Sequence, residues 1–101
     1  MYTKDQINNI IRRCAKVRGK EWCLLKLAEE CSELSSSILQ YLTKNDSEIN
    51  IQNEMGDVEI AIDILKIIYS NKIIDTAKQN KLEKIDRKNN EICNKKVKDN
   101  V

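Results

Sequence analysis

Apolar residues recur every three or four positions along most of the chain, which is the spacing of amphipathic helices. The pattern Thr3-Lys4-Asp5-Gln6 is a capping box, and it predicts a first helix that ends near Gly19. The expected later elements are helices over about 21–42, 48–69 and 75–94, a turn at 43–47 with Asp46 or Ser47 as the following cap, and a turn at 70–72. Asp75 is the expected cap of the fourth helix, and the tail from about residue 95 is expected to fray.

The second and third helices carry most of the apolar residues. The expected core stripe of the second consists of Leu24, Leu27, Ala28, Cys31, Leu34, Ile38 and Leu42. The expected core face of the third consists of Ile51, Met55, Val58, Ile62, Leu65 and Tyr69, widened by Ile60, Ile64, Ile67 and Ile68. A helix that is apolar almost all round is normally buried on several sides. We therefore expect a second subunit to cover part of it.

The composition favours an all-α fold. Among 101 residues there is no proline and there are only two glycines, so few residues interrupt helices. This length predicts a single domain over residues 1–101. A chain of this size buries only about two-thirds of its unfolded surface, which again favours a subunit interface.

Charge and cysteine content argue against several classes of partner. The net charge is only +2, so nothing indicates a nucleic-acid partner. No apolar run approaches the ~18 residues that a membrane span needs. The four cysteines match no zinc spacing and no signal peptide is recognised ahead of them, so a reduced cytoplasmic location is expected. Cys23 and Cys31 are expected to be small core residues.

Two pairs of carboxylates lie inside the most apolar helices. LAEECSEL, residues 27–34, contains Glu30 and Glu33, and NEMGDVEI, residues 53–60, contains Glu54 and Asp57. Residues three apart share a helix face, because each residue turns the helix by about 100°. The second pair continues the line of the apolar residues Ala61, Ile64 and Ile68. The adjacent Glu29 is expected to face solvent.

An antiparallel hairpin through the 43–47 turn would place both pairs at similar heights, given a rise of ~1.5 Å per residue. Carboxylates gathered in a partly dry site repel one another, and a divalent cation removes that conflict. Oxygen ligands without histidine select Mg²⁺, Mn²⁺ or Ca²⁺ over zinc. The chain contains no histidine, which argues against a Glu-x-x-His di-iron site. Solvated acidic helix faces are the alternative, because charged residues are mostly exposed.

The two acidic segments and a later basic segment follow one another in an order that resembles a known family signature. Glu29-Glu30-Cys31-Ser32-Glu33, then Glu54-Met55-Gly56-Asp57, then the basic stretch KLEKIDRK resemble the EExxE…ExxD signature of the MazG-like nucleoside triphosphate pyrophosphohydrolases. The similarity covers about residues 19–87. It implies a four-helix up-down bundle completed by oligomerisation, as a homodimer or homotetramer. The chain is shorter than the best-known members of that family.

The resemblance also implies a chemistry. Mg²⁺, or Mn²⁺ in its place, would be held by four ligands, Glu30, Glu33, Glu54 and Asp57, and would grip the triphosphate of an NTP or dNTP. A metal-activated water would attack the α-phosphorus, which gives a nucleoside monophosphate and pyrophosphate. Glu29 would support the ligands, bind a further metal or orient the water. All five acidic residues are therefore candidate catalytic residues.

Candidate substrate contacts come from basic and aromatic residues. Lys81, Lys84 and Arg87 share one side of the fourth helix and would neutralise the outer phosphates; alternatively they form a solvated face paired with acidic neighbours. Lys26 lies on the strip that leads to Glu30 and is a candidate for phosphate or base contact. Trp22 either stacks on the base or anchors the core.

Two other functions stay open at this level. One is a non-catalytic helical interaction module, in which the carboxylates are surface features and the isoleucine-rich face binds another protein. The other is a degenerate family member that binds nucleotide without hydrolysing it. The presence of every acidic motif position favours the enzyme over this last alternative.

Overall fold

The computed structural model describes residues 1–99, and these residues form an all-α structure without strands. The helices are α1 (Lys4–Arg18), α2 (Lys20–Lys44), α3 (Glu48–Ile68) and α4 (Asn71–Asp99). Backbone contacts divide the chain into two units, Met1–Tyr69 and Ser70–Val101. The first unit contains α1, α2 and α3, and the second contains α4. The predicted all-α class is confirmed.

The start of α1 follows the predicted capping box. The Thr3 hydroxyl accepts a hydrogen bond from the Gln6 backbone N–H at 3.2 Å, and the Gln6 side chain accepts one from the Thr3 N–H at 2.8 Å. The helix ends where predicted, at Gly19, whose φ of 83° lies in a region that favours glycine. This residue lets the chain turn at once into α2.

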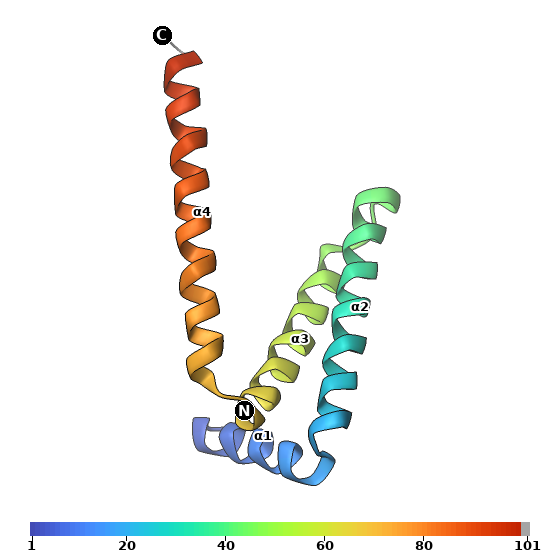
Figure 1. The fold of residues 1–101 in the computed structure, drawn as a ribbon. Helices are drawn as coiled ribbons and strands as arrows, with labels where there is room; N and C mark the ends of the chain where they lie inside the picture. The colour runs from blue at the N-terminus through green and yellow to red at the C-terminus, as the bar shows by residue number, and fades with distance from the viewer. Residues whose placement is uncertain (100–101) are drawn as a thin grey trace. The chain divides into compact units, whose positions relative to one another are not determined.

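α2 and α3 form an antiparallel hairpin within the first unit (Figure 1). Asn45 ends α2 in the left-handed conformation, with φ of 56°. The Ser47 hydroxyl accepts a hydrogen bond from the Ile49 N–H at 3.1 Å, which confirms the predicted cap of α3. Across the turn, the Tyr41 hydroxyl donates to Glu48 Oε1 at 2.6 Å, and this bond raises the pKa of Tyr41.

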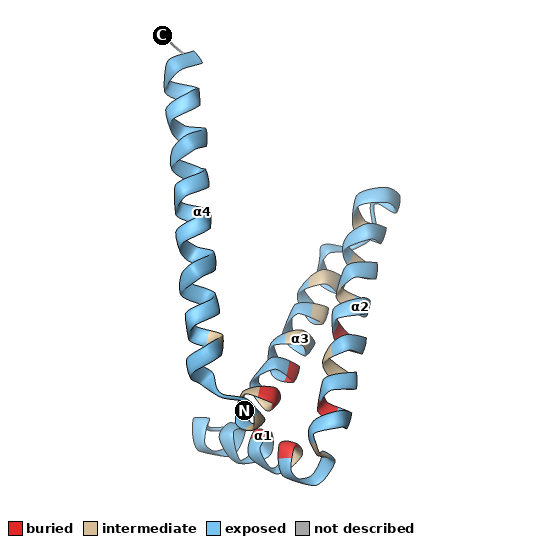
Figure 2. Ribbon diagram, in the orientation of Figure 1, coloured by how far each residue is buried: buried red, intermediate tan, exposed pale blue. Residues whose placement is uncertain are grey.

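The core of the first unit is small and lies mostly where its three helices meet (Figure 2). The buried apolar residues are Ile11, Ala15, Cys23, Ala61 and Leu65. α1 contacts α3 more extensively than it contacts α2. The expectation that Cys23 is a small core residue is confirmed, because it is 2% exposed.

The packed face of α2 differs from the predicted stripe. Within that stripe only Leu27 and Leu34 are half-buried, and the other five residues, Leu24, Ala28, Cys31, Ile38 and Leu42, are exposed. The prediction of Cys31 as a core residue is therefore wrong. The residues that are at least half-buried are Cys23, Lys26, Leu27, Glu30, Leu34, Ser37 and Tyr41. α2 is thus turned about its axis so that its mixed polar face, rather than its most apolar stripe, meets α3.

The packed face of α3 agrees with prediction in part. Ile51, Val58 and Leu65 are half-buried or buried, whereas the other three predicted residues, Met55, Ile62 and Tyr69, are exposed. Ala61, Ile64 and Ile68 complete the packed face. The line of residues that contains Glu54 is therefore the one that packs.

α4 differs from its predicted bounds at both ends. It begins at Asn71, so the predicted turn over residues 70–72 and the cap at Asp75 are wrong. It continues to Asp99, so the expected fraying is not seen over residues 95–99, and residues 100–101 lie outside the described part. No residue of α4 from Asn71 to Asp99 is buried. Without proline and with no internal glycine, nothing in this segment interrupts the helix.

Candidate functional site

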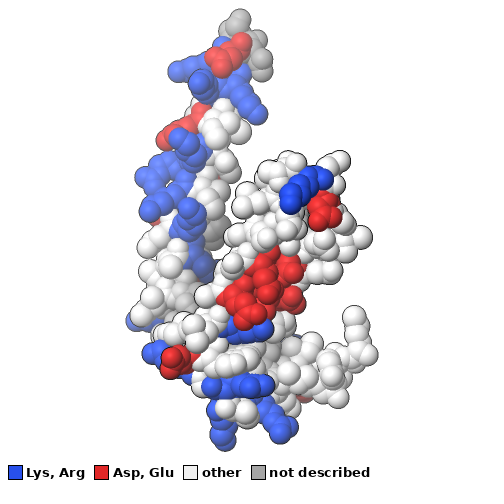
Figure 3. All heavy atoms as spheres, turned by 90° about the vertical axis from the view of Figure 1, so that its right-hand side faces the viewer, with Lys and Arg blue, Asp and Glu red and all other residues white. Residues whose placement is uncertain are grey.

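Three of the four expected ligands come together between α2 and α3. One carboxylate oxygen from each of Glu30, Glu33 and Glu54 lies within 4.8 Å of the other two. Glu30 and Glu33 are almost one turn apart on α2, and the antiparallel hairpin places Glu54 of α3 opposite them. Figure 3 shows a compact acidic patch near the centre of this face, with basic side chains directly beneath it and smaller acidic groups elsewhere. We call Glu30, Glu33 and Glu54 the glutamate cluster.

Two oxygens of the glutamate cluster are buried and have no hydrogen-bond partner. They are Glu30 Oε2 and Glu54 Oε2. Glu30 as a whole is only 7% exposed, and its other oxygen, Oε1, is paired with Lys26. Leaving a buried polar group unsatisfied costs about 1–3 kcal/mol, and more for a charged one. Neither oxygen has a hydrogen-bond partner among the described residues.

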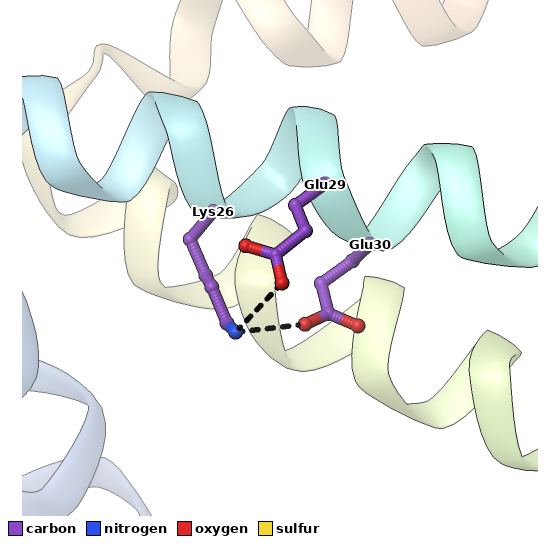
Figure 4. Close-up of polar contacts among 3 residues, drawn as sticks. All are labelled: Lys26, Glu29 and Glu30. Carbon is purple, nitrogen blue, oxygen red and sulfur yellow. Dashed lines mark ion pairs between the residues drawn. The ribbon is translucent and has the colours of Figure 1, made fainter.

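Lys26 compensates part of the charge. Lys26 lies about one turn before Glu29 and Glu30 on α2. Its Nζ is 3.2 Å from Glu30 Oε1 and 3.7 Å from Glu29 Oε1 (Figure 4). The hydrogen bond to Glu30 is the main reason why the pKa of Lys26 is raised, with attraction to Glu29 next. One ammonium group faces several carboxylates here, so the cluster keeps a net negative charge. That charge suits a cation.

Repulsion between the carboxylates of the cluster raises the pKa of Glu33. The charge of Glu30 is the largest cause that raises the pKa of Glu33, followed by reduced solvation and then by the charge of Glu54. A carboxyl with a raised pKa is one whose ionised form the site disfavours. A bound cation would reverse this effect, because it favours the ionised form of every carboxylate around it.

The glutamate cluster is a group of carboxylates that could hold a metal ion. The three oxygens lie within 4.8 Å of one another, a spacing that does not by itself distinguish Mg²⁺ from a larger cation. The donor set contains oxygen alone, which favours Mg²⁺, Mn²⁺ or Ca²⁺ over softer metals.

Asp57, the fourth expected ligand, stands beside the cluster rather than in it. It lines an open depression of about 280 Å³ together with Lys26, Glu30, Ile60, Ala61 and Ile64. The depression therefore has an acidic rim and an apolar wall supplied by α3. The two isoleucines of this wall, Ile60 and Ile64, were not among the predicted site residues, although their spacing from Asp57 places them on the same helix face.

The other candidate residues are placed as follows. The Glu29 side chain is 57% exposed, as expected for its position further round α2. Trp22 is 36% exposed, so it is not a buried core anchor. The guanidinium carbon of Arg18 lies over its ring, 4.8 Å from the ring centroid. Lys81, Lys84 and Arg87 are exposed on α4 in the second unit, and their contact with phosphate stays a prediction.

Two further observations concern the cysteines and the possibility of a membrane-spanning helix. All four cysteines are free thiols. None of the helices within residues 1–99 combines the length and apolar character that crossing a membrane requires.

Comparison with known proteins adds no relative. No protein-family model, curated protein or solved structure matches the chain. The geometry of the site and the order of its motifs are therefore what indicate a function.

Proposed function

We propose that this protein is a Mg²⁺-dependent nucleotide pyrophosphohydrolase of the MazG-like type, which cleaves an NTP or dNTP to the monophosphate and pyrophosphate in the cytoplasm. The observation that carries the proposal is the glutamate cluster, in which the 7%-exposed Glu30 keeps an unpartnered buried oxygen beside Glu33 and Glu54. The motif order adds to it, because acidic pairs followed by a basic helix suit a polyanionic substrate.

Each residue near the cluster has a definite task in this proposal. Glu30, Glu33 and Glu54 supply the oxygens that hold the cation, and Asp57 extends this set along α3. When bound, Mg²⁺ supplies positive charge to the triphosphate oxygens and polarises the bond to be cleaved. Glu29, exposed beside Lys26, is free to orient a water molecule, which matches one of its expected roles.

Lys26 is the present counter-ion of Glu30, and a bound cation would take over that role. Its ammonium now neutralises Glu30 at 3.2 Å, and it is 40% exposed, so it has room to move. With a cation held at Glu30, Lys26 would be available to donate to a phosphate oxygen. Lys81, Lys84 and Arg87 are assigned to the outer phosphates, and a second copy of the chain is assigned to complete the MazG-like up-down bundle.

Pyrophosphate release tests the proposal. A panel of canonical and modified NTPs and dNTPs is incubated with the full chain and Mg²⁺, and with the Glu33→Gln variant. We expect release from at least one nucleotide and a loss of at least about 100-fold in Glu33→Gln, since disturbing groups that merely support metal ligands already costs about 10–100-fold. Glu59→Gln, an exposed change elsewhere on α3, is the matched control and should retain activity. Absence of release with every nucleotide at high enzyme concentration would reject the proposal.

A non-catalytic interaction module is the second candidate. The observation in its favour is the number of large apolar residues exposed on α2 and α3, among them Leu25 at 65% and Leu42 at 69%. The two candidates differ in their response to ligand, because a ligand that binds only the folded state raises the melting temperature. A melting temperature that Mg²⁺ plus nucleotide leaves unchanged would favour the module.

A further inference from the structure

An apolar groove of about 270 Å³ lies between α1 and α3, and we call it the α1–α3 groove. Its volume is close to the smallest that are common for small-molecule sites, about 300–1,000 Å³. Tyr2, just ahead of α1, lines one part of it. The helices supply the rest of the lining, which consists of Ile7, Ile10, Ile11 and Cys14 from α1 and Ile60 and Ile64 from α3.

The α1–α3 groove adjoins the depression beside the glutamate cluster. Ile60 and Ile64 line both of them, so the two hollows share a wall on α3. These isoleucines stand three and seven residues after Asp57, which is about 4.5 and 10.5 Å farther along the helix. A molecule that lies across this wall has one end beside Lys26, Glu30 and Asp57 and the other end among apolar side chains.

A nucleotide is divided in the same way. Its phosphates are charged and bind cations, whereas the two faces of its base are apolar, and a single sugar joins the two parts. Contact of the base faces with aliphatic side chains removes apolar surface from water, which favours binding. Trp22, the aromatic residue that the sequence offers for stacking on a base, lines neither the groove nor the depression. The α1–α3 groove is therefore the better place for a base.

The α1–α3 groove has few groups that could read the polar edge of a base. Among the described residues that line it, only Tyr2 and Cys14 carry a hydroxyl or a thiol, and Tyr2 is 68% exposed. The backbone groups of the helical residues are used within the helices, as in the bond of 2.9 Å from the Ile7 N–H to the Thr3 carbonyl. The groove is open on one side, so the polar edge of a base would stay in water there.

We propose that the α1–α3 groove receives the base of the nucleotide and selects it by its apolar surface rather than by its hydrogen-bonding pattern. The identity of the ligand rests on the proposed function. The inference adds the place of the base and the property that separates good substrates from poor ones. A site that hydrogen-bonds a substrate rejects an analogue without the bonding group by about 10⁴–10⁵-fold, whereas an apolar site reaches only about 10²-fold.

The place of the base is tested by alkylation of Cys14, which lines the α1–α3 groove and is half-buried. The full chain is treated with N-ethylmaleimide, and mass spectrometry follows each thiol. With Mg²⁺ and the non-hydrolysable analogue α,β-methylene-dTTP, alkylation of Cys14 should slow by at least about fivefold, because a bound base covers it. Mg²⁺ with inorganic tripolyphosphate, which has no base, should leave its rate within about twofold. The exposed thiols Cys31 and Cys93 are the internal references and should keep their rates.

The mode of selection is tested with pairs of substrates and one filled groove. The kcat/KM values for dCTP and dUTP, which differ in a hydrogen-bonding group, should agree within about 10²-fold, and dTTP should exceed dUTP by up to about fourfold for its extra methyl group. Ile10 is 49% exposed, so Ile10→Trp can fill the groove, and it should raise KM for dTTP by at least about tenfold. Asn9→Trp, exposed and turned about 100° away on α1, is the matched control and should keep the parent value.

Several outcomes would overturn the proposal. They are an unchanged alkylation rate of Cys14 with the analogue, equal slowing by tripolyphosphate, and discrimination between dCTP and dUTP beyond about 10²-fold. Slowing of Cys14 alkylation by higher protein concentration alone would mean that a second copy occupies the groove, which also overturns it. Failure of the proposed function is distinguishable, because protection of Cys14 without any pyrophosphate release rejects the hydrolysis and keeps the base site. Pyrophosphate release with Cys14 unprotected rejects the base site alone.

Discussion

Along α2, Glu30 is 7% exposed, whereas Leu42, farther along the same helix, is 69% exposed. The two sides of the helix thus invert the usual relation between polarity and burial. The side that packs on α3 combines apolar residues with Lys26 and Glu30, whereas apolar residues such as Leu24 and Leu42 are exposed on the other side (Figure 2). Each departure has a cost, since one side carries unpaired buried oxygens and the other exposes leucine side chains.

The comparison suggests that each side is completed by something other than its own subunit. A cation would satisfy the buried oxygens of Glu30 and Glu54, and the second copy of the chain in the proposed bundle would cover exposed apolar residues. A chain of 101 residues has little apolar surface to spare for its core, so both partners would add appreciably to its stability.

The largest expected effect comes from the packed core beneath the site. Leu65 of α3 is 6% exposed, and Leu65→Ala should lower the free energy of unfolding by about 2–4 kcal/mol, because it leaves a cavity in a small core. Leu25 of α2 is 65% exposed, and Leu25→Ala should change it by no more than about 0.5 kcal/mol. Urea denaturation of the two variants measures both values. Similar losses would show that the outer side of α2 is packed as tightly as the core.

The second effect concerns removal of the cation. Addition of Mg²⁺ at about one hundred times its dissociation constant should stabilise the folded protein by about 2.7 kcal/mol relative to EDTA. Glu30→Gln should lose most of this gain, because it removes a charged ligand at the centre of the glutamate cluster. Glu59→Gln, at an exposed residue elsewhere on α3, is the control and should keep most of it. Thermal melts with Mg²⁺ and with EDTA measure this stabilisation. Equal stabilisation of the two variants by Mg²⁺ would contradict the cation site.

The smallest effect is a dependence of stability on pH in EDTA. The pKa of Glu33 is raised in the folded protein, chiefly by Glu30, so the folded state binds this proton more tightly than the unfolded state does. The Glu33 contribution to the free energy of unfolding should therefore decline as the pH rises from the unfolded pKa, about 4.3, through the folded pKa. Glu33→Gln should flatten this decline and should be the more stable form at about pH 7 in EDTA. A steeper decline in the variant would contradict the assignment.

Local sequence was enough to locate most of the helices and their ends. The capping box at Thr3, the stop at Gly19 and the cap at Ser47 involve residues only a few positions apart, so their hydrogen bonds can be read from the chain. The association of Glu54 with the packed line of Ala61 also follows from spacing along one helix. α4 was misjudged at both ends because its sparse apolar residues give little periodic signal.

The packed side of α2 required the tertiary structure. This helix has apolar residues over two adjacent arcs, one with Cys23 and Leu27 and one with Leu24 and Leu42, and its own periodicity does not choose between them. In the structure, the arc that includes Glu30 packs on α3. This rotation of α2 about its axis brings Glu30 and Glu33 close to Glu54, whereas Asp57 lies beside them at the rim of the depression. Rotation of a helix about its axis depends on the side chains of the neighbouring helix, and that information is spread across residues distant in the chain.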